Sequence, residues 1–433
     1  MRTVAFHTLG CKVNQYDSQA MLELFEQAGY EIRDFSQPAD VYVVNTCTVT
    51  GTGDKKSLQA VRRALRQNPA AQVVIAGCLA QRDGERLLET GARLVIGNAR
   101  RGEVVALLEE AVEKNQRVAA VSDILRVPYE PLSISRHEGH TRAVLKIQEG
   151  CDRYCAYCII PYVRGGIRSR APEEIGKEAA RLAQAGFAEL VLTGIHLTSY
   201  GRDLGGAGLL DAVRACDAPG VRRIRLGSLE PVIVTETFVS ALKVEKKVCP
   251  QFHLALQSGS DGVLRRMRRR YTTEEFRRAC ALLRAAFPCC AITTDVICGF
   301  PGETEEEFLE TAAFCREIGF ARMHVFPYSA RQGTPAAAMP GQVPKAVREG
   351  RARRLIAQGE GLSRAYREGQ VGLTLEVLAE EEAGGLCRGY TAQYIPCVFS
   401  GGRPGELWRV RITGLSEDGL TGEGISENGG GLA

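Results

Sequence analysis

The sequence has no run of about 18 consecutive apolar residues, the length that a membrane-spanning helix needs. Its first residues, Met1–His7, become polar within a few positions, so we expect no secretory signal there. The composition also lacks the marks of a disordered, collagen-like or coiled-coil chain, because 45% of the 433 residues are hydrophobic and only 24% are charged. These absences predict a globular, cytoplasmic protein with no membrane partner, long enough for about three domains.

A strong excess of one charge is also missing, since the net charge is only +4. The distribution is uneven, because the residues from Glu368 onward carry ten acidic side chains and four arginines, a local charge of −6. Basic clusters at 265–270 and 348–354 are typical of a solvated helix face or, alternatively, of a phosphate-binding surface. The overall charge therefore identifies no partner by itself.

The 15 cysteines are many for a cytoplasmic chain, where disulfides are rare. Their odd number and irregular spacing argue against a disulfide framework. Ligation of a metal by some of them and burial of the rest is the better interpretation.

Residues 1–125 alternate short apolar runs with amphipathic helical patterns. Runs rich in valine and isoleucine are typical of buried parallel strands, so the alternation predicts a doubly wound α/β domain. Residues 126–140 contain Pro128 and Pro131 among polar residues and are expected to form a linker. The expected strands are Thr3–Thr8, Asp40–Asn45 and Gln72–Ala76.

Residues 141–366 repeat this alternation with longer units, each an apolar run, a polar or glycine-containing loop and a helical pattern. Six such units predict a partial (β/α)6 barrel, in which chemistry gathers at the loops that follow the strands. The expected strands are Ala143–Ile147, Glu189–Leu192, Arg223–Leu226, Gln251–Leu254, Ala291–Val296 and Arg322–Val325.

Residues 367–433 change to short alternating runs separated by glycine and proline. This texture predicts a small all-β module, a five-stranded barrel. The expected strands are Val371–Leu378, Leu386–Tyr390, Ile395–Phe399, Leu407–Ile412 and Gly419–Ile425.

Cys151, Cys155 and Cys158 form a C-x3-C-x2-C pattern in the loop after the first expected barrel strand. Three thiolates this close suit a soft-metal site, and an iron–sulfur cluster is the natural occupant. A structural zinc site would need a fourth ligand, and the nearest histidines, His137 and His140, lie upstream across a strand. Three ligands for a four-iron cube leave one iron free to bind a small molecule.

This loop resembles the cluster loop of the radical S-adenosylmethionine superfamily, including the aromatic Tyr157 before the third cysteine. The resemblance implies that the amino and carboxylate groups of S-adenosylmethionine chelate the open iron. An electron from the reduced cluster would then cleave the sulfonium and yield a 5′-deoxyadenosyl radical, while the protein orients and shields the reaction.

Three further cysteines, Cys11, Cys47 and Cys78, each lie just past the end of an expected N-terminal strand. In an open α/β sheet ligands gather at that edge, so the three thiolates are expected to converge on a second cluster. The alternative is that they are simply buried, as free cysteines often are. The remaining nine are expected to be buried or inert: Cys216, Cys249, Cys280, Cys289, Cys290, Cys298, Cys315, Cys387 and Cys397.

Motifs along the whole chain together resemble the methylthiotransferase family, and the all-β module resembles its TRAM domain. Two of them, Thr193–His196 and Leu226–Pro231, resemble the branch that acts on threonylcarbamoyladenosine beside the tRNA anticodon. The family resemblance rests on the two cysteine groups and on Gly10–Gln15, Asn45–Cys47, Leu256–Ser260, Asp295–Thr304 and Phe326–Ser329.

The resemblance implies two [4Fe-4S] clusters and S-adenosylmethionine as cofactors. One S-adenosylmethionine would methylate a sulfur on the second cluster. Another would supply the radical that removes hydrogen from carbon 2 of the adenine, where the methylthio group is joined. An electron donor such as flavodoxin or ferredoxin is implied as a partner.

Barrel position places further residues near the cofactor, because each lies at or just beyond a strand end. Thr193 and Gly194 would offer main-chain groups to the methionine part, and Phe326 and Tyr328 would lie near the adenine. The full expected set is Tyr157, Thr193, Gly194, Ser228, Glu230, Gln257, Ser258, Asp295, Phe326 and Tyr328.

The threonyl carboxylate of such a substrate should meet a cation, for which Arg164 and Arg168 are candidates. An acidic TRAM module is unexpected for RNA binding. Either its aromatic residues (Tyr390, Tyr394 or Trp408) stack on bases, or the other domains make most of the contact.

Three alternatives to this function remain open. The methylthio group could go to isopentenyladenosine in tRNA or to a ribosomal-protein aspartate, the substrates of the other branches. The protein could also be a non-catalytic iron–sulfur module that binds RNA, which would have no need of an open iron.

Overall fold

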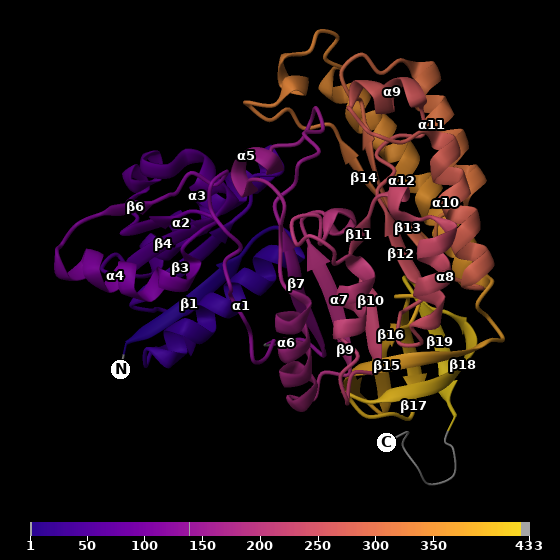
Figure 1. Cartoon of the computed structure of the whole chain (residues 1–433), viewed down its shortest axis with the longest axis horizontal. Coiled ribbons are helices and arrows are strands. Elements are labelled where there is room, and N and C mark those ends of the chain that lie inside the picture. Colours follow the sequence, from indigo (N-terminus) through magenta and orange to yellow (C-terminus); the bar gives the residue numbers. More distant parts are fainter. Residues whose placement is uncertain (1, 138, 426–433) are drawn as a thin grey trace.

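The N-terminal residues form a six-stranded, wholly parallel sheet in the order β2-β1-β3-β4-β5-β6, as seen at the left of Figure 1. The computed structural model describes residues 2–137 and 139–425. The strands are β1 (Thr3–Thr8), β2 (Glu31–Arg33), β3 (Val41–Thr46), β4 (Gln72–Gly77), β5 (Leu94–Ile96) and β6 (Val118–Ala120). The helices between them are α1 (Lys12–Gln27), α2 (Gly51–Gln67), α3 (Cys78–Asp83) and α4 (Val104–Glu113).

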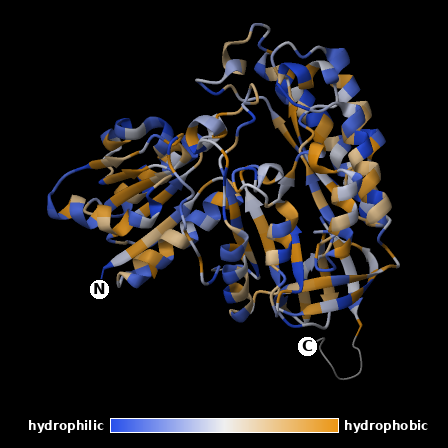
Figure 2. Ribbon diagram, in the orientation of Figure 1, coloured by the Kyte–Doolittle hydropathy of each residue, from blue (hydrophilic) through white to orange (hydrophobic). Residues whose placement is uncertain are grey.

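This sheet is apolar along its central strands because helices cover both of its faces. Separate clusters of buried side chains lie on the two faces, one centred on Tyr42, Val44 and Ile75, the other on Val43, Val74 and Ile96. Figure 2 shows hydrophobic strands beneath helices with hydrophilic outer faces. The predicted doubly wound α/β architecture is confirmed, and three short strands that the sequence did not indicate extend it.

The central residues form a curved array of parallel strands covered by helices on its outside. Two four-stranded sheets, β10-β9-β7-β8 and β11-β12-β13-β14, are joined because only Gly227 separates β10 from β11. All six predicted strands are present, and β8 is a short antiparallel addition. The strands are β7 (Arg142–Glu149), β8 (Arg168–Ser169), β9 (Glu189–Gly194), β10 (Arg223–Leu226), β11 (Ser228–Leu229), β12 (Gln251–Leu254), β13 (Ala291–Cys298) and β14 (Arg322–Pro327).

The helices of this partial barrel follow the strands in sequence. They are α5 (Ile160–Arg164), α6 (Pro172–Gln184), α7 (Leu209–Ala215), α8 (Glu236–Val244), α9 (Asp261–Arg266), α10 (Thr273–Ala286), α11 (Glu305–Ile318) and α12 (Lys345–Glu368). Threonine side chains cap α10 and α11, each within a capping box. In the part of the chain that the structure describes, no helix has both the length and the apolar character that crossing a membrane requires.

The C-terminal residues form the predicted five-stranded closed barrel, in the order β15-β16-β17-β19-β18. Its strands are β15 (Thr374–Ala383), β16 (Leu386–Thr391), β17 (Pro396–Ser400), β18 (Leu407–Leu415) and β19 (Leu420–Gly424). The first strand begins at Thr374 rather than at the expected Val371, because the chain makes a turn in which Leu373 N–H donates to the carbonyl of Gln370.

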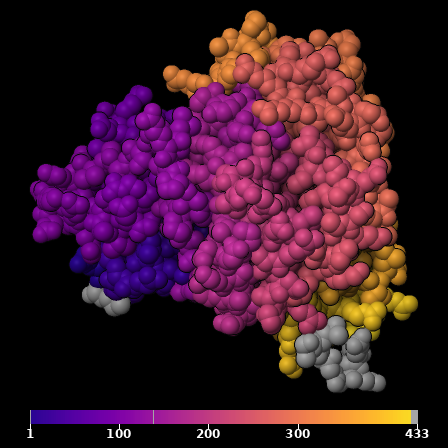
Figure 3. All heavy atoms as spheres, in the orientation of Figure 1, coloured from indigo at the N-terminus to yellow at the C-terminus, as the bar shows by residue number. Residues whose placement is uncertain are grey.

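The small barrel lies beneath the central one, at the end where the central strands begin (Figure 1). Arg142 at the start of β7 pairs with Glu380 at 2.8 Å, and Arg223 at the start of β10 pairs with Glu376 at 2.7 Å. The loops that follow the central strands are therefore at the opposite end from this barrel. Figure 3 shows the N-terminal and central domains as one continuous surface on the face in view.

Candidate functional site

Three cysteine loops meet at one edge of the N-terminal sheet. Cys11 precedes α1, Cys47 follows β3 and Cys78 begins α3, and the strands that lead to them are neighbours. Gly10 packs directly on the second loop, since a Cβ there would lie 3.1 Å from the Cys47 sulfur. Burial, with a smaller contribution from the neighbouring Cys78 and Cys11 thiols, raises the pKa of Cys47 to about 11. The structure thus brings together the second predicted cysteine group.

Hydrogen bonds from side chains close to the cysteines connect the three loops. The Asn14 amide donates to the carbonyls of Leu9 (2.7 Å) and Thr46 (2.9 Å), which joins the first loop to the second. The Thr46 hydroxyl donates to the Ala76 carbonyl (2.5 Å) and accepts from Leu79 N–H (3.2 Å), which joins the second loop to the third. Asn14 and Thr46 belong to the motifs Gly10–Gln15 and Asn45–Cys47, and the sequence alone assigned them no role. The signal that could have found them is a short polar side chain close to a cysteine, since Asn14 follows Cys11 by three positions and Thr46 directly precedes Cys47.

Cys151, Cys155 and Cys158 lie in the loop between β7 and α5, at the open end of the central barrel. Backbone bonds fix the loop, since Cys151 N–H donates to Gly165 O and Cys158 N–H donates to Cys155 O, both at 2.9 Å. Burial chiefly, with the Cys155 thiol adding to it, raises the pKa of Cys151 to about 11 and that of Cys158 to about 12. Such thiols ionise when a metal binds them.

The donor sets fit iron–sulfur clusters better than single ions. In the described residues, no group of three or more histidine, cysteine, aspartate or glutamate side chains closes on one metal ion. A four-iron cube takes each cysteine on a different iron, so its ligand sulfurs stand farther apart than the ligands of one ion. Cys11 is exposed, Cys47 is half-buried and Cys78 is buried, so the group reaches the surface on one side. Both cysteine groups therefore fit the soft, three-thiolate site of a cluster.

Glu230 is buried beside the loop of Cys151, Cys155 and Cys158 and contacts several charged side chains there. Its carboxylate pairs with Arg269 (2.8 Å) and Arg153 (2.9 Å) and lies 3.1 Å from the His196 ring nitrogen. Burial alone would raise the pKa of Glu230, but the hydrogen bond with His196 and the charges of Arg269 and Arg153 outweigh it and hold the pKa at about 2. Arg269 also donates to the Cys155 sulfur at 3.2 Å. Glu230 thus fixes the two arginines that flank the cysteine loop.

Thr193 and Gly194 end β9, as expected, whereas Ser228 begins the two-residue strand β11 and Asp295 lies three residues before the end of β13. Thr193 is buried, and Gly194 packs so closely on Gln148 that a Cβ there would lie 2.8 Å from its side chain. Ser228 is exposed in β11, and the Asp295 carboxylate lies 3.4 Å from the His253 ring nitrogen. Contact of these residues with a ligand stays a prediction.

Polar side chains on the neighbouring strands β12, β13 and β14 lie side by side, and the sequence did not predict this grouping. His253 and His324 lie with ring centroids 6.2 Å apart, and Asp295 stands in register with His324. The His253 ring also contacts the Thr293 hydroxyl at 3.0 Å. Strand alternation could have grouped these side chains on one face of the sheet.

The remaining predicted residues, Tyr157, Tyr328, Phe326, Gln257 and Ser258, differ in how far they are exposed and in what they contact. Tyr157 packs against the cluster of buried side chains that includes Tyr328, while Phe326 is 47% exposed in β14. Gln257 adopts a left-handed conformation with φ +65°, and its N–H donates to Asp295 O at 2.8 Å. Ser258 is turned away from the others, because its hydroxyl bonds to that of Thr311 on α11 at 3.1 Å.

Three expectations about side-chain availability are wrong. Arg164 is fully buried, donates to Cys78 and Asn14, and pairs with Glu149, so it is not free for a substrate carboxylate. Arg168 is also buried and donates to the carbonyl of Arg164. Tyr390 and Tyr394 stack on each other and on the Arg142 guanidinium, so they do not present free faces to bases.

Burial of the other nine cysteines is confirmed except at one position. Cys289 is exposed, whereas the remaining eight are buried.

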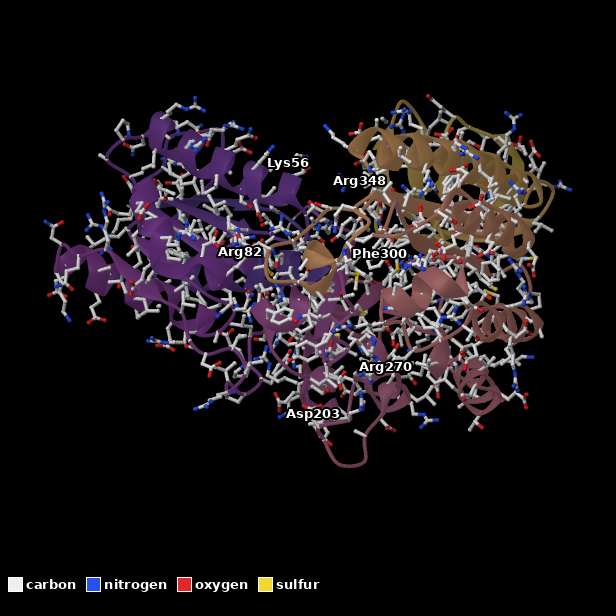
Figure 4. All side chains as sticks on the ribbon, turned by 90° about the horizontal axis from the view of Figure 1, so that it is seen from above. Lys56, Arg82, Asp203, Arg270, Phe300 and Arg348 are labelled. Carbon is white, nitrogen blue, oxygen red and sulfur yellow. The ribbon has the colours of Figure 1, made fainter. Side chains whose placement is uncertain are left out.

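The N-terminal domain contacts the open end of the barrel directly. Asp54 of α2 pairs with Arg331, just beyond β14, at 2.5 Å and with Arg82 of α3 at 2.9 Å. Figure 4 shows Lys56 and Arg82 on one side of this junction, and Arg348, Phe300 and Arg270 on the other. Cys78 of the N-terminal group packs against Ile159 and Val163, which follow Cys158, so both cysteine groups lie at this junction between domains.

Two family descriptions match the chain: uncharacterized protein family UPF0004 over residues 3–97 and the radical SAM superfamily over residues 145–315. The chain is 45% identical to a Bacillus subtilis (strain 168) protein named threonylcarbamoyladenosine tRNA methylthiotransferase MtaB, with 95% of this chain and 94% of that protein covered. A Pelotomaculum thermopropionicum protein named tRNA-2-methylthio-N(6)-dimethylallyladenosine synthase is 36% identical, with 98% and 97% covered.

Among solved structures, the radical S-adenosylmethionine methyltransferase TsrM from Kitasatospora setae has a similar fold. The TM-score is 0.58 at 15% sequence identity, with 78% of this chain and 77% of that one covered. At this identity the likeness concerns the fold alone.

Proposed function

Because the chain belongs to the family of radical S-adenosylmethionine tRNA methylthiotransferases, we propose that it inserts a methylthio group at carbon 2 of N6-threonylcarbamoyladenosine beside the tRNA anticodon. The observation that carries the proposal is the meeting of two three-cysteine groups, Cys11, Cys47 and Cys78 with Cys151, Cys155 and Cys158, at one domain junction. One such group would suffice for cofactor cleavage alone. The second gives the protein a place to hold the sulfur that is transferred.

The cysteine groups would hold two [4Fe-4S] clusters, the central one binding S-adenosylmethionine. When bound, the central cluster supplies the electron for cofactor cleavage and the N-terminal one presents sulfur. Glu230 keeps Arg153 and Arg269 in place beside the central loop. The proposed cofactor-contacting residues are Tyr157, Thr193, Gly194, Ser228, Glu230, Gln257, Ser258, Asp295, Phe326 and Tyr328, with Ser258 acting through its turn rather than its hydroxyl.

We assign these roles to three domains and a linker. The N-terminal methylthiotransferase domain comprises residues 1–125, the linker 126–140, the radical S-adenosylmethionine domain 141–366 and the TRAM domain 367–433. The partners are tRNA, bound at its anticodon loop, S-adenosylmethionine and an electron donor such as flavodoxin or ferredoxin. A tRNA substrate is consistent with the cytoplasmic location expected from the sequence.

For the threonyl carboxylate, the structure offers Lys12 in place of the two buried arginines. Its ammonium lies 5.8 Å from the centre of the Tyr394 ring, and among the described residues it forms no ion pair. Arg142 and Arg225 also lie nearby, but they are paired with Glu380 and Glu189, so Lys12 is, within the described part of the chain, the cation of this group that is left without a carboxylate. An anion is therefore favoured beside Lys12.

Nucleoside analysis of bulk tRNA from cells that lack the gene tests the proposal. We expect 2-methylthio-N6-threonylcarbamoyladenosine to disappear and its unmethylthiolated precursor to accumulate. Loss of the isopentenyladenosine derivative instead would assign the protein to that branch, and unchanged tRNA would favour a ribosomal-protein substrate or a non-catalytic RNA-binding role.

A further inference from the structure

Arg164 is the one residue of the central domain whose side chain, within the described residues, is seen to bond a thiol of the N-terminal cysteine group. Its Nε–H donates to the Cys78 sulfur at 3.1 Å, and a second nitrogen donates to the Asn14 side-chain oxygen. Asn14 in turn holds the loops of Cys11 and Cys47 through the Leu9 and Thr46 carbonyls. One guanidinium therefore contacts a cysteine and the residue that positions the other two.

The remaining nitrogen of the same guanidinium, Nη1, pairs with the Glu149 carboxylate at 2.7 Å. Glu149 lies two residues before Cys151, so Arg164 spans the distance from one cysteine group to the backbone that leads into the other. Arg164 itself follows the central loop, at the end of α5. The contact is thus built into the segment that carries the central cysteines.

The guanidinium is held rigidly by a buried network of charges. Glu149 and Asp17 supply the negative charge, and Arg101 and Lys146 are further buried cations that pair with them. Arg164 is fully buried, so it cannot turn to solvent without disrupting these pairs. Its hydrogen bond to sulfur is therefore a fixed feature of the junction.

A fixed cation that donates to a ligand sulfur has two effects on a cluster. It orients the thiolate, and it favours the reduced, more negative state, because hydrogen bonds to the sulfurs and nearby charge set the potential. Cys78 is also reached by the Asn98 amide, but at 3.6 Å and without a charge. Arg164 is the stronger donor.

We propose that Arg164 is a positioning residue through which the central domain completes the N-terminal cluster site, orienting Cys78 and raising the reduction potential of the cluster there. This inference rests on the proposed function only in requiring that the second cluster exists. The N-terminal domain alone would then hold a cluster of lower potential, and correct docking of the two domains would be needed for a competent sulfur site.

The test uses full-length protein in which Cys151, Cys155 and Cys158 are replaced by alanine, so that only the N-terminal cluster remains. In that background, iron and sulfide counts and an EPR-monitored redox titration are compared for Arg164, Arg164→Gln and Arg164→Lys. Arg101→Gln is the matched control, since Arg101 is buried in the same network but bonds no cysteine. Circular dichroism of each variant reports folding.

We expect Arg164→Gln to shift the cluster potential to more negative values or to lose cluster iron while it remains folded. Arg164→Lys should recover part of the shift, because it keeps the charge but loses the two-pronged geometry. Potential and iron content equal to those of the unaltered background, or an equal shift in Arg101→Gln, would overturn the inference. If Arg164→Gln does not fold, the comparison of Arg164→Lys with Arg101→Gln decides. Absence of any cluster in the background protein would instead contradict the second cluster of the proposed function.

Discussion

The Tyr394 ring of the C-terminal barrel lies 4.7 Å from the guanidinium carbon of Arg225 in the central barrel. The same ring stacks on Tyr390 and is 4.8 Å from Arg142, while Arg225 also donates to the Ala392 carbonyl at 2.9 Å. The segment 390–394 therefore closes the end of the central barrel at which its strands begin. A module expected to bind RNA has a second, structural task here.

Replacing Tyr394 by alanine should lower the free energy of unfolding by about 1–2 kcal/mol, because it removes desolvated cation–π contacts with two arginines. Thermal or denaturant unfolding of the apo protein measures the effect. Leu386→Ala, an exposed apolar truncation in the same module, is the control and should change little. Equal stability of both variants would contradict the closing role of this segment.

Removal of residues 368–433 should weaken tRNA binding and also destabilise the central domain, because Arg223 and Arg225 lose partners there. The loss of tRNA affinity should be modest, given the acidic balance of the module. Binding assays over a range of salt concentrations measure it. Wild-type affinity at every salt concentration would show that the module makes no RNA contact.

Replacing Cys151, Cys155 and Cys158 by alanine should leave one cluster and abolish 5′-deoxyadenosine formation. Replacing Cys11, Cys47 and Cys78 should leave cofactor cleavage intact while methylthio transfer disappears. Iron counting measures the number of clusters in each variant, and mass spectrometry measures 5′-deoxyadenosine and the methylthiolated product. Equal loss of cofactor cleavage in the two triple variants would disprove this division of roles.

Glu230→Gln should destabilise the protein by about 3 kcal/mol at neutral pH, because it leaves two buried arginine charges without their carboxylate. The pKa of Glu230 is held at about 2, below its ordinary 4.5, so the stabilisation is complete above pH 4.5 and is lost as the pH falls toward 2. The gap between wild type and variant should close over that range. Glu236→Gln, in an exposed pair with Arg278, is the control and should show no such gap.

Lys12→Gln should reduce turnover of threonylcarbamoylated tRNA far more than 5′-deoxyadenosine formation without tRNA. A charge-assisted bond to the substrate carboxylate contributes mainly to substrate binding, so KM should rise more than kcat falls. Lys243→Gln, on the exposed side of α8, is the control. An unchanged KM would exclude Lys12 as the carboxylate partner.

The sequence predicted the elements of the fold and both cysteine groups because the relevant signals are local. Strand ends are marked by apolar runs, and Cys11, Cys47 and Cys78 each follow one directly. The contacts of Arg164 and Tyr394 could not be predicted in this way. Arg164 and Cys78 are 86 positions apart, and Arg225 and Ala392 are 167 apart, so their pairing depends on how the domains dock. Arg164 looked available in the sequence because Asn14, Asp17 and Cys78, which surround it, lie in the N-terminal domain.

The most direct test of the account is turnover on one tRNA prepared with and without the threonylcarbamoyl group, followed by mass spectrometry of its nucleosides. The account predicts methylthiolation of the modified tRNA and at most a trace on the unmodified one, because a site built for the carboxylate leaves a cation unpaired without it. Equal turnover on the two tRNAs, or preference for isopentenyladenosine, would contradict it.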